Sequence, residues 1–180
     1  MKYIKLFEEL KNSDLFILKN HICTFLENIK LETSREFRMA VDRSYYDRFD
    51  KHNLNSLALR ATYGYTKFGR TDDQLLTVKI NNVQDKKQKE NSTKFKITFD
   101  FCYDSNRDTA ARRSTKDFMD GLLYFTTIIF NKYKYYVKKN PYPENKQLTY
   151  FINSSDIQNI IQDLTKENFE FIVNAKKYNL

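Results

Sequence analysis

The segment KFKITFDFCY, residues 94–103, constrains the fold more than any other part of the chain, because its apolar and polar residues alternate without a break. Successive side chains of a β-strand point to opposite faces, so such a segment has one apolar face and one polar face. The pattern predicts a strand of an antiparallel sheet that packs on a core with one side and faces water with the other. The expected inward residues are Phe95, Ile97, Phe99, Phe101 and Tyr103.

Other segments predict further strands of the same sheet. Residues 57–68 and 74–83 alternate less regularly, with an expected turn, GRTDD, between them at residues 69–73. Short connections between successive strands favour an antiparallel meander. Residues 147–153 are expected to add another strand. Residues 34–45 fit a strand or a helix, and the sequence leaves both open.

Apolar residues at helical spacing predict two helices that cover this sheet. Residues 14–30 carry one apolar stripe, which indicates an amphipathic helix. Residues 114–136 are apolar almost all round, which is typical of a buried helix lying across a sheet. Ser114 and Asp117 resemble a capping box at its start, and Pro141 is expected to end it.

The ends of the chain are expected to be helical as well. Residues 154–164 and 165–178 have the pattern of two short capped helices, and residues 1–12 that of a leader or docking helix. The sequence therefore predicts an α+β fold, in which an antiparallel meander of three to five strands packs against a long central helix, with N- and C-terminal helices. A length of 180 residues favours a single domain over residues 1–180.

Composition indicates a folded protein with a core rich in rings. Hydrophobic residues make up 41% of the chain and aromatic residues 16%, with 15 Phe and 13 Tyr. This aromatic content exceeds what one small core readily hides, which favours association with a partner. No stretch approaches the roughly 20 apolar residues of a membrane span, so we expect no membrane partner and a location in the cytoplasm or in a virus particle.

The inventory of catalytic residue types is thin. The two histidines, His21 and His52, have no local signature of a nucleophile or metal site around them. Cys23 and Cys102 are too few for a disulfide framework or a zinc cluster, and we expect both to be reduced. Only 3 Gly occur, which cannot build a phosphate-binding loop. These features indicate a protein that is not an enzyme and that uses no metal and no cofactor.

Charge is the most informative functional feature. The net charge of +8 favours acidic partners such as nucleic acid or an acidic protein face. Four cations, Arg107, Arg112, Arg113 and Lys116, precede or open the long helix, where the helix dipole disfavours positive charge. The expected fold gives these four cations no evident structural role. An arginine pair at a helix N-terminus is suited to bind a phosphate or a carboxylate. We interpret these four residues as an anion- or partner-binding patch.

Two other groups of lysines have a structural explanation. Lys132, Lys134, Lys138 and Lys139 lie at the expected end of the long helix, where cations complement its partial negative charge. Residues that alternate with the inward rings of the sheet, including Lys94 and Lys96, are expected on its outer face. That face is expected to lack the aromatic rings that stack bases, which favours an ordinary solvated face.

The opening residues, MKYIKLFEEL, carry an apolar stripe that is interpreted as a partner-docking surface: Tyr3, Leu6, Phe7 and Leu10. This leader resembles the short amphipathic leader with which many proteins of large tailed phages begin. The predicted order of elements is also similar to that of the small α+β rings that join phage heads to tails. The resemblance implies a head–tail connector protein of the virion that needs no catalytic residues.

Two functions remain open on these grounds. The first is a non-enzymatic structural or assembly protein, in a phage connector or neck ring, that acts through protein–protein contacts as a homo-oligomer or within a larger assembly. The alternative is a basic accessory protein that binds nucleic acid through Arg107, Arg112, Arg113 and Lys116.

Overall fold

The computed structural model describes eight stretches of the chain: residues 14–30, 37–43, 56–66, 69–83, 94–102, 110–134, 136–137 and 146–178. Its elements follow the chain in the order α2 (Asp14–Ile29), β1 (Phe37–Asp42), β2 (Ser56–Thr66), β3 (Gly69–Val83), β4 (Lys94–Phe101), α3 (Ala110–Tyr133), β5 (Tyr136–Val137), β6 (Lys146–Asn153), the 3-10 turn η1 (Ser154–Asp156), α4 (Ile157–Asp163) and α5 (Lys166–Tyr178).

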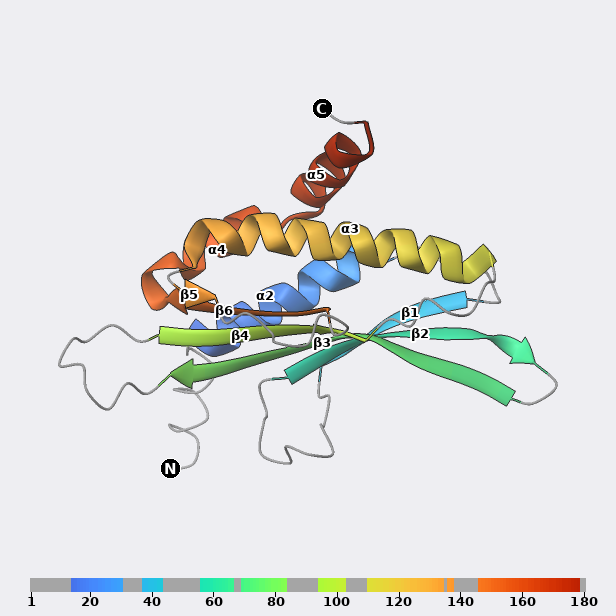
Figure 1. Ribbon diagram of the computed structural model, residues 1–180. Helices are drawn as coiled ribbons and strands as arrows, with labels where there is room; N and C mark the ends of the chain where they lie inside the picture. The colour runs from blue at the N-terminus through green and yellow to red at the C-terminus, as the bar shows by residue number, and fades with distance from the viewer. Residues whose placement is uncertain are drawn as a thin grey trace, which may run out of the picture.

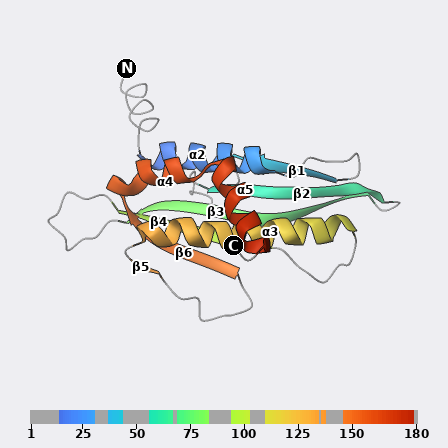
Figure 2. The same ribbon diagram turned by 90° about the horizontal axis from the view of Figure 1, so that it is seen from above.

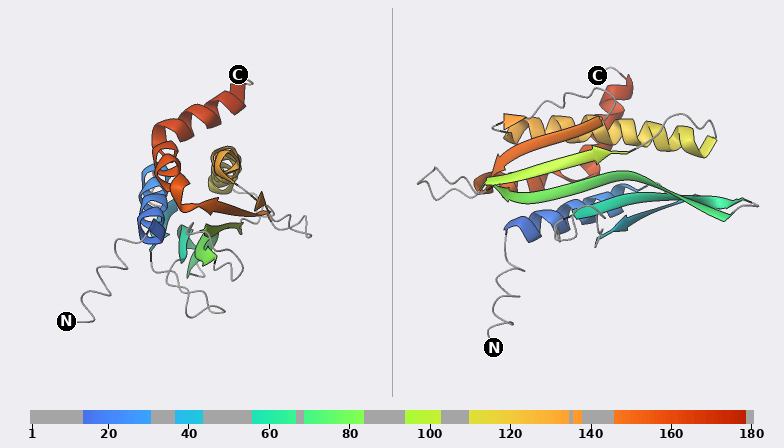
Figure 3. Two further views of the ribbon diagram at one scale, coloured as in Figure 1. Left: turned by 90° about the vertical axis from the view of Figure 1, so that its left-hand side faces the viewer. Right: turned by 60° about the horizontal axis from the view of Figure 1, so that its bottom comes forward.

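The molecule has an antiparallel sheet with helices on one of its faces (Figure 1). Helix α2 contacts β1, β2 and β3, whereas α3 contacts β6 at the other side of the sheet. Seen from above, α2 and α3 run side by side over the sheet, and α5 crosses above them (Figure 2). Figure 3 shows α5 rising from the helical layer, away from the sheet. The predicted α+β class, with a long central helix and terminal helices, is confirmed.

The six strands have the order β1-β2-β3-β4-β6-β5, and every neighbouring pair is antiparallel. Strands β1 to β4 form the predicted meander. Strand β6 returns beside β4 after α3, and the two-residue β5 pairs with it. The segment left open between strand and helix is resolved in favour of the strand β1, since Phe37 to Asp42 pair along β2.

The predicted turn at residues 69–73 is wrong. These residues belong to β3, where Asp72 pairs with Thr62 and Asp73 pairs with Ala61. Glycine and aspartate are uncommon in strands, but pairing along the whole of β2 overrides that preference. The hairpin therefore extends well beyond the alternating part of the sequence, and Thr66 pairs with Gly69 at its end.

The alternation in β4 has the consequence expected from it. Phe95, Ile97, Phe99 and Phe101 are all buried, while Tyr103 lies outside the described residues. Apolar residues of the neighbouring strands stand level with them, for example Ile80 of β3 and Tyr150 of β6 on either side of Ile97. The same face thus stays apolar across three strands, and the helices cover it.

Helix α3 covers this face beside β6. Its predicted stripe of Phe118, Leu122, Phe125 and Ile129 is buried. The predicted capping box is wrong, because the helix begins at Ala110 and Ser114 lies inside it. Two alanines at positions 110 and 111 are strong helix formers and extend the helix toward the N-terminus. Its other end also precedes the expected stop at Pro141, because the helix ends at Tyr133 and β5 follows.

Two clusters of rings hold the layers together. In the first, Phe25 of α2 stacks on Phe125 of α3 with ring centroids 5.3 Å apart, and Phe169 of α5 meets the Phe125 ring edge-on at 5.4 Å. In the second, Phe130 of α3 lies 4.9 Å from Phe99 of β4 and stacks on Tyr150 of β6 at 5.4 Å. Much of the aromatic content is therefore used in the core, where such pairs contribute about 0.5–1.5 kcal/mol beyond their buried area.

The corner between α4 and α5 fixes the direction of the last helix. Thr165 caps α5, because its hydroxyl accepts a hydrogen bond of 3.2 Å from the backbone N–H of Asn168. The ring Nε2 of His21 on α2 donates to the carbonyl of Leu164 at 3.1 Å. The two predicted C-terminal helices are therefore confirmed, and the corner that joins them is tied to α2. The predicted cap is present at α5, whereas Asp156 makes no side-chain hydrogen bond that caps α4.

Candidate protein-contact site on helix α5

The residues predicted to bind a partner are only partly described. The leader stripe of Tyr3, Leu6, Phe7 and Leu10 and the cation Arg107 lie outside the described residues. Arg112 and Arg113 are the third and fourth residues of α3, so they lie in its first turn, but the structure describes only their backbone. Lys116 follows one turn later and is exposed. Arg112, Arg113 and Lys116 thus open α3 as predicted, and their role in binding stays a prediction.

Helix α5 packs on α3 through one face. Phe169 is buried in the ring cluster, and Val173 approaches the backbone of α3 at Gly121. A Cβ atom at Gly121 would stand 3.3 Å from both methyl carbons of Val173, which is tighter than most contacts of this kind. Glycine in the middle of a helix costs roughly 0.5–1 kcal/mol relative to alanine, and here it allows α5 to approach closely.

A groove of about 690 Å³ runs beside this contact. Its lining includes Asp117 and Asp120 of α3 and Val173, Asn174 and Lys177 of α5. Lys176 also lines it, and the ammonium of this lysine lies 4.6 Å from the ring centroid of Tyr124. Lys116 of the predicted cationic patch is not among the residues that line the groove.

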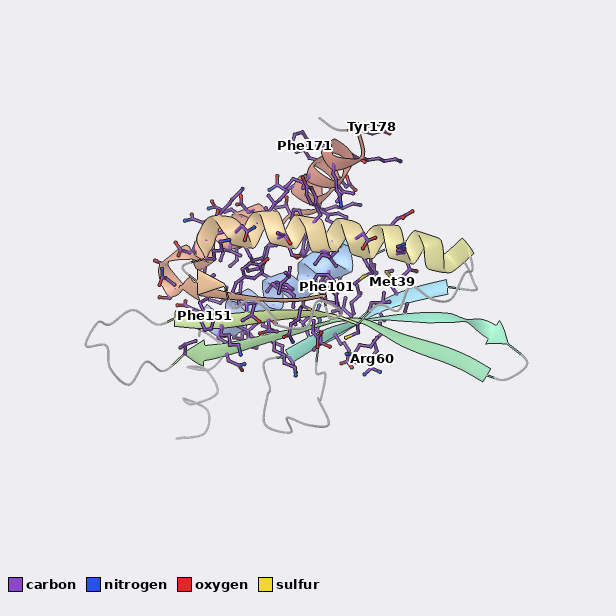
Figure 4. All side chains as sticks on the ribbon, viewed as in Figure 1. Met39, Arg60, Phe101, Phe151, Phe171 and Tyr178 are labelled. Carbon is purple, nitrogen blue, oxygen red and sulfur yellow. The ribbon has the colours of Figure 1, made fainter. Side chains whose placement is uncertain are left out.

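The opposite face of α5 carries two exposed rings. Phe171 is 74% exposed and Tyr178 is 64% exposed. They are seven residues apart, so their Cα–Cβ bonds leave the helix within about 20° of each other. Figure 4 shows both on α5, beyond α3 as seen from the sheet. They form a stripe on the exposed side of α5.

Sequence reasoning missed this stripe. The segment 165–178 was expected to be a helix, but Phe169, Ile172 and Val173 offer one apolar face while Phe171 and Tyr178 offer another. Which face packs inward depends on where α3 lies. The sequence did contain one signal for this stripe. Phe171 and Tyr178 are seven residues apart and lie off the main apolar stripe, and a helix that packs through one face rarely needs a second apolar face.

Charge along α5 changes sign from its beginning to its end. Glu167 and Glu170 lie in the first half, and Lys176 and Lys177 in the last turn, which is the arrangement that the helix dipole favours. Glu170 forms an exposed ion pair of 3.7 Å with Lys166, and the ammonium of Lys177 lies 5.7 Å from the ring centroid of Tyr178. Exposed pairs of this kind contribute little on their own.

The outer face of the sheet is polar, as predicted, with one addition. Lys79 and Lys96 are half-buried there, and the hydroxyls of Thr98 and Thr149 lie 3.3 Å apart between neighbouring strands. The prediction that this face lacks aromatic rings is wrong for β6, because Phe151 stands level with Lys96. Phe151 and Arg60 are labelled at the sheet in Figure 4. A single half-buried ring does not make a stacking platform.

Both cysteines are free thiols, as expected. Cys102 follows β4 and is exposed, whereas Cys23 is fully buried against the core. Cys23 is one of the residues through which α2 packs on the core. Burial raises the pKa of the Cys23 thiol and also that of Cys102, where the Asp100 carboxylate adds to the effect. Both thiols are therefore protonated at neutral pH.

Other kinds of site find little support in the described part of the chain. A smaller hollow of about 390 Å³ is lined by residues of α2, including His21, and of the start of α5. The imidazole of His21 is already hydrogen-bonded to the carbonyl of Leu164. The described residues hold no group of three or more His, Cys, Asp or Glu side chains placed to bind a metal. Among them no helix has the length and apolar character to cross a membrane.

Comparison with known proteins adds no relative. The chain matches no protein-family model, its sequence matches no curated protein, and no solved structure matches its fold.

Proposed function

We propose that this protein is a non-enzymatic structural or assembly protein that acts through protein–protein contacts, and that the outer face of α5 is one of its contact surfaces. The observation that carries this proposal is the pair of exposed rings, Phe171 and Tyr178, on a helix whose other face is fixed to α3. Single exposed apolar residues are common and need no explanation. Two rings at heptad spacing on a projecting helix form a stripe that a partner can cover.

Energetics favour a role in binding over a role in folding. Burying a large apolar side chain contributes roughly 1.5–3 kcal/mol, and most of this remains unused for Phe171, which is 74% exposed. Aromatic side chains lose few rotamers on binding and are enriched among the residues that dominate interface energies. The inner face of α5, with Phe169 in the ring cluster, keeps the helix in place while its outer face stays available.

The specific form that we propose is a component of the connector or neck ring of a tailed phage. Support for it comes from the sequence of the leader and from the order of the described elements, in which a helix, an antiparallel meander, a long helix, a strand and terminal helices follow one another. A test with assembled particles decides this form, because function is specified by sites and not by fold. Antibody labelling of purified virions of the source phage should place the protein at the neck.

The contact surface is tested by the double variant Phe171→Ala/Tyr178→Ala. Because both rings are exposed, we expect its far-UV circular dichroism and melting temperature to match those of the wild type. We expect its sedimentation velocity profile, or its incorporation into assembled particles, to show lost association. The matched control is Phe16→Ala, which removes an exposed ring from α2 and should leave association unchanged. Equal association of the double variant and the wild type contradicts the proposal.

A second function is favoured by one specific observation. Since α3 begins at Ala110, Arg112 and Arg113 lie in its first turn, where backbone N–H groups have no partner within the helix. A helix N-terminus attracts anions, and arginine binds phosphate through two parallel hydrogen bonds. The alternative proposal is therefore that Arg107, Arg112, Arg113 and Lys116 bind the nucleic acid backbone.

A further inference from the structure

The charges beside the exposed rings have a regular spacing. Glu170 precedes Phe171 by one residue, and Lys177 precedes Tyr178 by one residue. Residues seven apart lie on the same side of a helix, so Glu170 and Lys177 flank the ring stripe on one side. Each is solvent-accessible, and their charges are opposite. The outer face of α5 thus carries a ring and an acid in its first half, and a ring and a base in its second half.

This arrangement is complementary to itself when one copy is reversed. A two-fold axis perpendicular to α5, midway between residues 173 and 174, brings residue 170 of one copy level with residue 177 of the other. Glu170 of each copy then faces Lys177 of the other copy, which gives two opposite-charge pairs. The same axis brings Phe171 level with position 176, two residues or about 3 Å from Tyr178 of the other copy.

We propose that the outer face of α5 binds α5 of a second copy of this chain in an antiparallel pair. The proposal rests on the proposed function, because it names the partner of the contact surface described there. Each Phe171 lies beside Tyr178 of the second copy, and each Glu170 forms an ion pair with Lys177 of the second copy. Asn174 and Ala175, which are small, lie near the axis and let the two helices approach closely.

A parallel pair fits the charges poorly. It brings the glutamates of both helices together at one end and the lysines of both together at the other, and like charges that face each other across an interface are unfavourable. The antiparallel pair also sets the opposite dipoles of the two helices side by side. Charge therefore selects the antiparallel orientation, while the rings supply the apolar contact.

The area that the two helices can bury against each other is small. Helix α5 has 13 residues and so is roughly 20 Å long. Two such helices bury less than the roughly 800 Å² per partner of a standard stable interface. We therefore expect a dimer that forms as concentration rises, and not a permanent one. Such a two-fold contact closes on itself, so a ring built from these dimers needs a second contact elsewhere on the chain.

Charge reversal tests the orientation directly. Sedimentation equilibrium should show that Glu170→Lys and Lys177→Glu each raise the dissociation constant of the dimer roughly five- to tenfold, because both symmetric ion pairs become repulsive. The double variant Glu170→Lys/Lys177→Glu exchanges the charges and should bring the dissociation constant back to within about twofold of the wild type. Loss of both rings in Phe171→Ala/Tyr178→Ala should weaken the dimer by more than about tenfold.

The control for net charge is Lys30→Glu, which changes the charge of an exposed side chain just after α2 by the same amount as Lys177→Glu. It should leave the dimer unchanged. A wild type that stays monomeric at the highest soluble concentration overturns this proposal. So does a double charge variant that is as weak as the single variants. If the wild type is monomeric but the ring variant loses binding to a different protein of the particle, this proposal fails and the proposed function stands.

Discussion

The hydroxyl of Tyr133 donates a hydrogen bond of 2.8 Å to the Asp163 carboxylate, and this contact joins the end of α3 to the end of α4. Lys132 reaches the same carboxylate oxygen at 3.0 Å. An aspartate at the C-terminal end of a helix is disfavoured by the helix dipole, so Asp163 depends on these two donors. Because α5 follows α4 after two residues, the contact also helps to place the candidate site.

Replacement of Tyr133 by phenylalanine tests this contact. We expect Tyr133→Phe to lower the free energy of unfolding by about 1 kcal/mol at pH 7, since Asp163 is partly solvated and keeps Lys132. The measurement is urea denaturation followed by circular dichroism. The matched control is Tyr178→Phe, which removes an exposed hydroxyl and should change the unfolding free energy by less than about 0.3 kcal/mol.

The same contact predicts a dependence on pH. The hydrogen bond to Asp163 is the main cause that raises the pKa of Tyr133 from 10.0 to about 12. A group with a raised pKa in the folded state stabilises the protein fully below its unfolded pKa and loses this contribution as pH rises through the folded pKa. The difference in stability between wild type and Tyr133→Phe should therefore shrink between pH 10 and pH 12. A constant difference over this range would contradict the assignment.

The contact between Gly121 and Val173 predicts a change of sign in a double-mutant cycle. Alanine at position 121 gains up to about 1 kcal/mol of helix propensity, but its Cβ would stand 3.3 Å from the Val173 methyl carbons. We expect Gly121→Ala to be neutral or destabilising in the wild type and stabilising in a Val173→Ala background, with a coupling of about 1 kcal/mol. Thermal unfolding of the four proteins measures it. Equal effects in both backgrounds would show that α5 does not press on Gly121.

Much of the fold could be predicted because, in several segments, the local sequence pattern alone indicates which side chains are buried and which are exposed. Strand β4 was predicted well because its apolar side faces helices and its polar side faces outward, so alternation specifies the face. Helix α3 was predicted for the same reason, since Leu122 and Phe125 need a cover. The helix over residues 165–178 was predicted as capped, and Thr165 caps it, because a cap depends only on its neighbours in sequence.

What the sequence did not predict depends on partners distant in the chain. Asp72 and Asp73 are typical of a turn, and only their pairing with β2 places them in a strand. The candidate site is of the same kind. Phe169 and Phe171 are both phenylalanines of one helix, and the position of α3 decides that the first is buried and the second exposed. Local spacing does not contain this information.

The two cysteines are expected to differ in their reactivity toward a thiol reagent. Cys102 is exposed and Cys23 is buried, so iodoacetamide should modify one thiol per native chain and two after unfolding in denaturant. Because burial and Asp100 raise the pKa of Cys102, its modification should be slower than that of free cysteine at pH 7.5 and should still increase above pH 9. Cys102→Ser should abolish the native reaction. Fewer than two thiols in the unfolded chain would reveal a disulfide.

The cations at the start of α3 give a prediction about nucleic acid. If Arg112 and Arg113 contact phosphates, their replacement by glutamine should weaken DNA binding and reduce the slope of log affinity against log salt by roughly 1–2, since each phosphate contact contributes about 0.7–0.9. Fluorescence anisotropy at several salt concentrations measures the slope with duplex and single-stranded DNA.

The control for this experiment is the pair Lys138→Gln/Lys139→Gln, which removes the same charge from positions that follow the long helix in sequence. It should leave the salt slope nearly unchanged if the phosphate contacts lie at the start of α3 and not at these lysines. A slope carried by the lysine pair would move the phosphate contacts to that end of the molecule and make its tyrosines stacking candidates. If the wild type binds no DNA even at low salt, the nucleic-acid alternative fails, and the arginines at the start of α3 are then better explained as contacts to an acidic protein face, which agrees with assembly through protein contacts.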